Sequence, residues 1–249
     1  MSITVIAVND APVANNQAVT TNEDTAKAIT LSATDVEGSP LTYAIVIDPA
    51  HGTLSGTAPN LTYTPAANYD GTDSFTFKAN DGELDSNTAA VSITVTAVND
   101  APVASDQAVV TDEDTAKAIA LGATDIEGSA LTYATVTGPA HGTLTGTAPA
   151  LTYTPTANYN GPDSFTFKAN DGELDSNIAT VSIIVTAVND APVASNQAVT
   201  TDEDTATAIT LSATDIEGSA LSYAIVSPPA HGTLSGAAPN VTYTPALNY

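Results

Sequence analysis

The sequence contains no cysteine, no tryptophan and no arginine, and it has only four lysines in 249 residues. Without cysteine, disulfides are excluded, so each domain must be held by a hydrophobic core, by metal ions or by both. Against these four lysines stand 28 acidic residues, which gives a formal net charge of −24. Because contacts to phosphate require Lys and Arg, this composition excludes charge-driven binding to nucleic acid or to an anionic membrane.

Long apolar runs are also missing. No stretch reaches the roughly 20 apolar residues of a membrane-spanning helix, and no basic and apolar leader resembling a signal peptide opens the sequence. A low aromatic content with high net charge can indicate disorder. Here 43% of the residues are hydrophobic, and many alternate with polar ones. The sequence therefore predicts a folded, strand-rich protein.

The segment Val-Asn-Asp-Ala-Pro-Val-Ala occurs three times, beginning at Val8, Val98 and Val188. A constant period of 90 residues with nearly identical sequence indicates tandem structural units. The predicted units are repeat 1 (8–97), repeat 2 (98–187) and an incomplete repeat 3 (188–249). Residues 1–7 match 91–97, so they are predicted to be the last strand of a preceding repeat. We expect the chain to be part of a longer repetitive protein.

Each repeat is predicted to be an all-β domain. In repeat 1 the segments that read as strands are 17–22, 26–34, 41–47, 51–54, 61–64, 73–79 and 89–97. Segment 41–47 is almost continuously apolar, which predicts a strand buried on both faces. Seven short strands without a helical period favour antiparallel β-sandwiches of immunoglobulin-like type, arranged in a linear array.

Alternation along these strands predicts the hydrophobic core of repeat 1. Its expected members are Ile29, Leu31, Leu41, Tyr43, Ile45, Tyr63, Phe75, Phe77, Val91, Ile93 and Val95.

The acidic residues gather in loops at the ends of the predicted strands, as in NEDT (22–25), ATDVEG (33–38) and NDGELD (80–85). Acidic residues in loops are often only solvated. In this chain, however, several acidic loops are expected to meet at the ends of neighbouring domains, without Lys or Arg close by in the sequence. Oxygen ligands beside glycine turns favour Ca²⁺ over zinc or copper.

Two segments carry a family resemblance. ATDVEGSPLTYAIV (33–46) resembles the cadherin run Ala-x-Asp-x-Asp-x-Gly followed by Leu-Thr-Tyr. ANDGELDSNTAAVSITVTAVNDAPVA (79–104) resembles the cadherin run that ends in Asp-x-Asn-Asp-Asn-Ala-Pro. The chain is similar to cadherin repeats, and more closely to the bacterial cadherin-like tandem repeats of large surface and RTX-type adhesins.

This resemblance implies Ca²⁺ between consecutive repeats, and it implies the residues that bind it. At the joint between repeats 1 and 2 they are Glu23, Asn99, Asp100, Asp125, Glu127 and Asp171. At the joint between repeats 2 and 3 they are Glu113, Asn189, Asp190, Asp215 and Glu217. The equivalent residues at the start of repeat 1 are Asn9, Asp10, Asp35, Glu37 and Asp81.

The chain departs from the cadherin pattern in its linkers. Alanine replaces the first aspartate of the linker (Ala97 and Ala187) and its final asparagine (Ala101 and Ala191). The Leu-Asp-Arg-Glu motif is replaced by 68–71, Asn-Tyr-Asp-Gly. We therefore expect one or two ions per joint, bound with a dissociation constant of roughly 10⁻⁴–10⁻³ M.

The expected function is that of a calcium-stiffened extender in a large bacterial cell-surface or secreted adhesin, with a role in cell adhesion or biofilm. Its neighbours through Ca²⁺ are the adjacent repeats. The alternatives are a carbohydrate-binding or homotypic module, and an acidic spacer that needs no metal.

An enzyme is not expected. His51, His141 and His231 occur once per repeat, and no Gly-x-Ser-x-Gly elbow is present, so the histidines are interpreted as turn residues. Tyr69 and Tyr159 could stack on a sugar, but a position in the core or at a corner is favoured. Addition of strand 1–7 to repeat 3 of another molecule is disfavoured because 7 residues cannot replace 28. Repeat 3 is predicted to be less stable than the other two.

Overall fold

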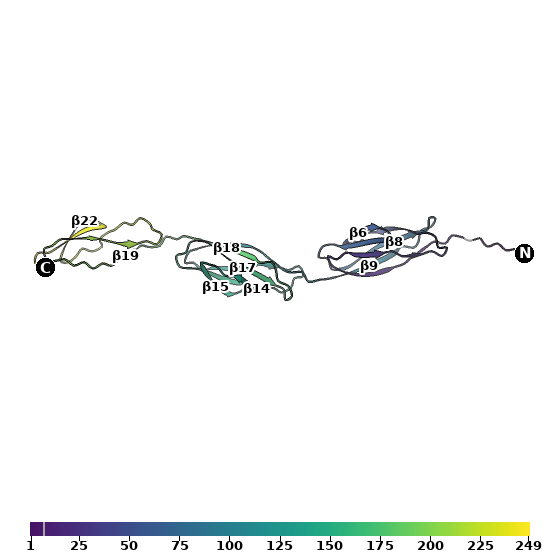
Figure 1. Ribbon diagram of the computed structural model, residues 1–249, viewed down its shortest axis with the longest axis horizontal. Coiled ribbons are helices and arrows are strands. Elements are labelled where there is room, and N and C mark those ends of the chain that lie inside the picture. Colours follow the sequence, from purple (N-terminus) through teal and green to yellow (C-terminus); the bar gives the residue numbers. More distant parts are fainter. Residues whose placement is uncertain (7) are drawn as a thin grey trace. The chain divides into compact units, whose positions relative to one another are not determined.

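The structure is a computed structural model that describes residues 1–6 and 8–249. Its regular elements are β-strands, drawn as arrows in Figure 1. Among the described residues, none forms a helix long and apolar enough to cross a membrane. The predicted all-β class is confirmed.

Repeat 1 folds into two main sheets and one small sheet. Its strands are β1 (Val13–Ala14), β2 (Gln17–Asn22), β3 (Lys27–Thr30), β4 (Ala33–Thr34), β5 (Thr42–Ile47), β6 (Gly52–Thr57), β7 (Asn60–Pro65), β8 (Gly71–Asn80) and β9 (Ala89–Thr96). One sheet has the order β2-β9-β8-β5, and the other has the order β3-β7-β6. Strand β1 pairs with β4. Figure 1 labels β6, β8 and β9.

Repeat 2 has the same topology. Its strands are β10 (Val103–Ala104), β11 (Gln107–Asp112), β12 (Lys117–Ala120), β13 (Ala123–Thr124), β14 (Thr132–Thr137), β15 (Gly142–Thr147), β16 (Ala150–Pro155), β17 (Gly161–Asn170) and β18 (Ala179–Thr186). The sheets have the orders β11-β18-β17-β14 and β12-β16-β15, and β10 pairs with β13.

Repeat 3 retains the smaller sheets only. Its strands are β19 (Val193–Ala194), β20 (Thr207–Thr210), β21 (Ala213–Thr214), β22 (Gly232–Ala237) and β23 (Asn240–Pro245), in the orders β20-β23-β22 and β19-β21. Segments 197–202 and 222–227 correspond to β11 and β14 but are not strands. Their partners in repeat 2, β18 and β17, have no counterpart before Tyr249.

The predicted sandwich is purely antiparallel, but the structure contains one parallel pair in each complete repeat. Strand β2 runs parallel to β9, with Val19 opposite Ile93, and β11 runs parallel to β18. Since β2 and β9 lie at opposite ends of the repeat sequence, this pairing joins its first long strand to its last.

The predicted core of repeat 1 is largely confirmed. Phe75, Phe77, Val91 and Ile93 have no exposed surface, because every second residue of β8 and β9 faces the opposite sheet. Other predicted core members that are buried are Ile29, Leu31, Tyr63 and Val95. Tyr43 and Ile45 are partly buried and pack against this core. Leu41 is only partly buried and lies outside the cluster.

Two strand predictions are wrong in detail. The expected strand 26–34 is divided, because the chain leaves one sheet at Leu31, whose N–H donates to the Pro59 carbonyl at 2.9 Å, and joins β1 two residues later. The expected doubly buried strand 41–47 is instead β5, the edge of its sheet, and its alternate residues are exposed. Residues 1–6 form no strand, and Ala7 of the predicted strand 1–7 lies outside the described residues.

Candidate functional site

Most of the predicted metal ligands fall into three corresponding groups. We call them group 1 (Asn9, Asp10, Asp35, Glu37, Asp81), group 2 (Asn99, Asp100, Asp125, Glu127, Asp171) and group 3 (Asn189, Asp190, Asp215, Glu217). Groups 1 and 2 each combine a linker with two loops of the repeat that follows, and group 3 combines a linker with one such loop. Group 3 has no fifth member because the chain carries no counterpart of Asp171.

In group 2 the linker is hydrogen-bonded to both loops. The Asn99 side-chain amide donates to Asp171 Oδ2 at 2.8 Å, and the Asp100 N–H donates to Glu127 Oε2 at 3.3 Å. Group 1 repeats this arrangement, with Asn9 donating to Asp81 at 2.8 Å. The structure therefore brings together, pairwise, the residues that the sequence predicted for one site.

Only one of the two carboxylate oxygens of Asp125 has a hydrogen-bond partner. Its Oδ1 accepts the Ser129 N–H at 2.8 Å, whereas its Oδ2 is buried and has no hydrogen-bond partner. Asp35 in group 1 has the same arrangement, with Ser39 as its donor. A buried carboxylate oxygen without a donor is costly, and such atoms usually have a partner. A cation would supply that partner.

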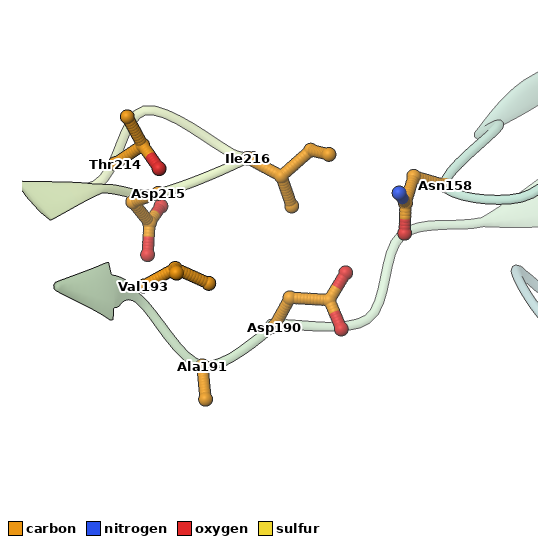
Figure 2. Close-up of a pocket in the computed structure, with 7 residues that line it drawn as sticks. All are labelled: Asn158, Asp190, Ala191, Val193, Thr214, Asp215 and Ile216. Atoms are coloured by element: carbon orange, nitrogen blue, oxygen red, sulfur yellow. The ribbon is translucent and has the colours of Figure 1, made fainter. Parts of the chain in front are cut away.

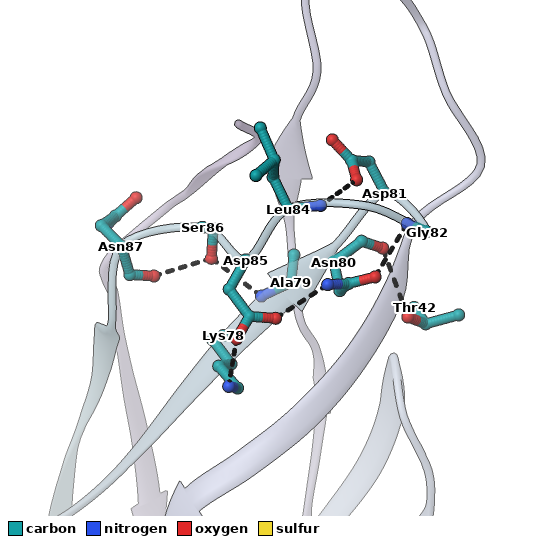
Figure 3. Close-up of polar contacts among 10 residues, drawn as sticks. All are labelled: Thr42, Lys78, Ala79, Asn80, Asp81, Gly82, Leu84, Asp85, Ser86 and Asn87. Carbon is teal, nitrogen blue, oxygen red and sulfur yellow. Dashed lines mark hydrogen bonds and ion pairs between the residues drawn. The ribbon is translucent and has the colours of Figure 1, made fainter. Parts of the chain in front are cut away.

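The Asp81 carboxylate is positioned by its own loop, between β8 and β9 (Figure 3). Asp81 Oδ1 accepts the N–H groups of Glu83 and Leu84, both at 2.7 Å. These bonds and the one from Asn9 hold the pKa of Asp81 below its usual value. Asp171 is held in the same way, with Leu174, Asn99 and Glu173 as donors. Both carboxylates thus remain charged, as a cation ligand must be.

The expectation that no basic residue accompanies the acidic loops is wrong for the loop between β8 and β9. Lys78 forms an ion pair with Asp85, and the Asn80 side chain also donates to Asp85 (Figure 3). The lysine was overlooked because it precedes the acidic run as an outward-facing residue of β8. Asp85 therefore belongs to the support of the loop.

One further predicted ligand lies on the repeat before each of the linkers that begin at Val98 and Val188. Glu23 and Glu113 are buried, with 6% and 4% of their surface exposed. Glu23 accepts the Val98 N–H at 2.5 Å, and Glu113 accepts the Val188 N–H at 2.5 Å. Each glutamate therefore fastens the first residue of a linker to the repeat that precedes it.

Group 3 borders a pocket of about 350 Å³. Figure 2 shows the side chains of Asp190, Asp215 and Asn158 around it, and Ala191, Val193 and Ile216 form its apolar part. Asn158 was missed by the sequence reasoning. The signal that could have found it is its recurrence as Asn68 and Asn248, all with positive φ, in loops held by Asp114, Asp24 and Asp204.

No three His, Asp or Glu side chains of residues 1–6 and 8–249 lie close enough together to form a complete metal site. The donors that are present are carboxylate and amide oxygens, which is the ligand chemistry of Ca²⁺. Together with the unpartnered oxygens of Asp35 and Asp125, these donors fit a hard cation.

The buried carboxylate of Asp73 was not predicted from the sequence. Asp73 accepts the Tyr63 hydroxyl at 2.8 Å and the N–H groups of Ala50, His51 and Ser74. Burial raises its pKa, but these four hydrogen bonds outweigh that effect and leave the pKa below its usual value. Asp163 is placed identically in repeat 2. This carboxylate fixes the β5–β6 connection to β8.

The histidines and corner tyrosines pair with each other. The rings of His51 and Tyr69 are stacked with centroids 4.2 Å apart, and His141 with Tyr159 and His231 with Tyr249 repeat the contact. The Tyr69 hydroxyl donates to the Thr72 carbonyl at 2.8 Å. The geometry agrees with the predicted turn and corner roles.

Comparisons with known proteins place this geometry in a family. The bacterial Ig domain matches three times, over residues 9–94, 99–184 and 189–249. Integrin beta-like protein A of Dictyostelium discoideum is 32% identical over 214 residues, which cover 69% of this chain and only 11% of that protein.

Solved structures share the fold. The human CDH23 repeats EC21-23 align with a TM-score of 0.57 and 16% identity, covering 96% of this chain and 91% of theirs. An endo-fucoidan hydrolase of glycoside hydrolase family 107 is 27% identical over 72% of this chain and 29% of its own, with a TM-score of 0.33. The match to the family covers most of the sequence in three copies. The chain therefore belongs to the bacterial Ig domain family, as a tandem array with a cadherin-like fold.

Proposed function

We propose that the chain is a non-enzymatic extender segment of a bacterial surface or secreted adhesin, and that Ca²⁺ stiffens the joints between its repeats. The carboxylates of Asp125, Asp171 and Glu127 do not form a complete site as they stand, so they would have to move closer together to hold the ion at group 2. The carbonyl oxygen of a rotated Asn99 side chain would be a further ligand. The ion would be the positively charged partner that these oxygens otherwise lack. Group 1 would act in the same way.

The observation that supports this proposal most strongly is the buried, unpartnered oxygen of Asp125 and its repetition at Asp35. The same unfavourable arrangement occurs twice, each time in a group that also contains a carboxylate held by backbone N–H groups. This fits a site that is completed by a cation. The net charge of −24 also supports cation binding, because bound cations reduce the repulsion between acidic groups within the folded chain.

The first experiment is thermal unfolding of the whole chain in EDTA, followed by titration with Ca²⁺ or Mg²⁺. At about 100 times the dissociation constant, an ion stabilises its site by ~2.7 kcal/mol. For domains of this size that corresponds to an increase in Tm of roughly 10–20 °C. We expect the increase with Ca²⁺ at or below millimolar concentrations, and a smaller one with Mg²⁺.

The matched variants separate a site from a general charge effect. D125N/E127Q should lose the Ca²⁺ response at group 2, while E83Q/E173Q removes the same charge from the neighbouring loops without touching a predicted ligand. An equal response in the two variants would contradict the assignment. No Ca²⁺ response in the unmodified chain would leave an acidic spacer that needs no metal.

A binding module for carbohydrate or for a homotypic partner is the second candidate. Tandem repeats with a cadherin-like fold are compatible with it, and it makes no use of the acidic groups. A glycan array with the whole chain would test the carbohydrate branch, and retention of binding in D125N/E127Q would separate that function from the metal site.

A further inference from the structure

The acidic residues are absent from one continuous part of each repeat. Residues 128–159 and 218–249 contain no Asp, Glu, Lys or Arg, and the equivalent 38–69 contains Asp48 alone. The 28 acidic residues of the chain thus lie almost entirely elsewhere. In repeat 2 the uncharged part forms β14, β15 and β16.

This uncharged part forms one free side of each complete sandwich. Strands β14 and β15 are the last strands of their respective sheets, and only four residues connect them. Strands β5 and β6 are placed in the same way in repeat 1. The outer backbone N–H and C=O groups of an edge strand are complementary to another strand edge.

The exposed side chains of this edge are small or apolar. Val46 and Val136 are 48% and 44% exposed, and Thr132 and Ala134 are also exposed. At the opposite edges, by contrast, β12 begins at Lys117 and β11 ends at Asp112. Edge strands are usually protected by charges, and β14 has none.

We propose that β5 and β14 are each a docking edge for a second copy of this chain, which adds its own equivalent strand by antiparallel pairing. Two chains that each carry −24 charges repel wherever their acidic loops approach. An uncharged edge is the surface on which they meet with least repulsion, and a two-fold pairing presents the same edge from both copies. The proposal does not depend on Ca²⁺.

Sedimentation velocity of the whole chain tests this association, in EDTA and at about 0.15 M salt, where charge repulsion is screened beyond roughly 8 Å. Between about 10 μM and 1 mM the mass of the unmodified chain should rise from monomer towards dimer, with a dissociation constant in that range. V46E/V136E brings like charges into the paired edges and should weaken association at least tenfold.

The control V13E/V110E adds the same two charges at exposed positions away from this edge, where Val13 is 55% and Val110 is 56% exposed. It should associate like the unmodified chain. If the unmodified chain stays monomeric at 1 mM, or if both variants lose association equally, the proposal is overturned.

A single introduced cysteine locates the contact, because the chain has no other. Opposed residues of antiparallel strands have Cα atoms about 4.5–5.5 Å apart, which suits a disulfide. A134C or V136C should therefore give covalent dimers on mild oxidation, and V110C should not. Equal cross-linking of V110C would show that the copies meet elsewhere and would overturn the assignment of the edge.

Discussion

Repeats 2 and 3 have nearly the same sequence up to Tyr249 but differ in how much of it is ordered into strands. In repeat 2, segments 107–112 and 132–137 are strands β11 and β14, on either side of β18 and β17. In repeat 3 the equivalent segments 197–202 and 222–227 form no strand, although β20, β22 and β23 are retained. Strand propensity therefore does not suffice, and these segments require their central partners.

The comparison also shows which contacts are local. The hairpin β22–β23 keeps the register of β15–β16, including the glycine next to the tyrosine ring, because it needs no residue beyond Tyr249. The Tyr243 hydroxyl donates to the His231 carbonyl at 2.8 Å, whereas Tyr153 donates to Asp163 at 2.8 Å and lies 3.3 Å from the His141 carbonyl. Without the carboxylate, the hydroxyl turns to the nearest backbone acceptor.

The strongest way to remove the difference is to complete repeat 3. Appending a copy of residues 160–187 after Tyr249 should order segments 197–202 and 222–227, because it supplies the central strands and their two phenylalanines. Hydrogen exchange of these segments should slow by roughly 10³-fold or more, since stable small domains unfold with about 5 kcal/mol. The same tail with both phenylalanines changed to alanine should give much less protection.

A complementary change makes repeat 2 resemble repeat 3. Phe165 is fully buried between the sheets, so F165A should destabilise repeat 2 by about 3–5 kcal/mol, through the lost apolar contact and the cavity. Hydrogen exchange measured during denaturation should show a loss of protection in β11 and β14, and the protection of β5 in repeat 1 should be unchanged. V110A, at an exposed position, should cost less than about 0.5 kcal/mol. A uniform loss across both repeats would contradict repeat-by-repeat stability.

The smallest expected effect concerns the carboxylate that repeat 3 lacks. D163N leaves the geometry of the side chain but weakens four hydrogen bonds, and should cost about 1–3 kcal/mol in repeat 2. The pKa of Asp163 is lowered in the folded state, so its stabilisation is complete above the unfolded value of 3.8 and is lost as the pH falls through the lower folded value.

Unfolding measured from pH 7 down to about pH 2 should therefore show less acid-induced loss in D73N/D163N than in the unmodified chain. The matched control is D48N, which changes an exposed acid with no counterpart in repeat 2, where Gly138 stands. An identical acid profile for D73N/D163N and D48N would show that the buried carboxylates do not contribute as argued.

The sequence predicted the fold where alternation is strong. Strands β8 and β9 were placed within three residues because Phe75, Phe77, Val91 and Ile93 recur at every second position. Their parallel neighbour β2 was found as a strand, but its pairing was not, since alternation does not encode the partner of a strand or its direction. The exposure of β5 was missed for the same reason.

For the candidate site, the sequence identified loops but not the separate tasks of their acidic residues. Asp35 and Asp125 are left with an unpartnered oxygen, whereas Asp24 and Asp85 bind within the fold. Asp73 looked like an ordinary polar start of a strand, and only the packing of Tyr63 against it revealed a buried carboxylate. These roles depend on donors that are distant in sequence, so spacing alone could not assign them.

The pairing of β2 with β9 has a consequence for biosynthesis. A repeat can close only after its last strand has left the ribosome, roughly 70 residues after its first long strand. At about 5–20 residues per second this takes several seconds. During this time the last strands of later repeats have not yet been made. Because β9 and β18 are nearly identical in sequence, they could exchange partners in a chain refolded from denaturant. Synthesis in order from the N-terminus lets repeat 1 close with β9 before β18 exists, so that β9 is already paired when repeat 2 is made.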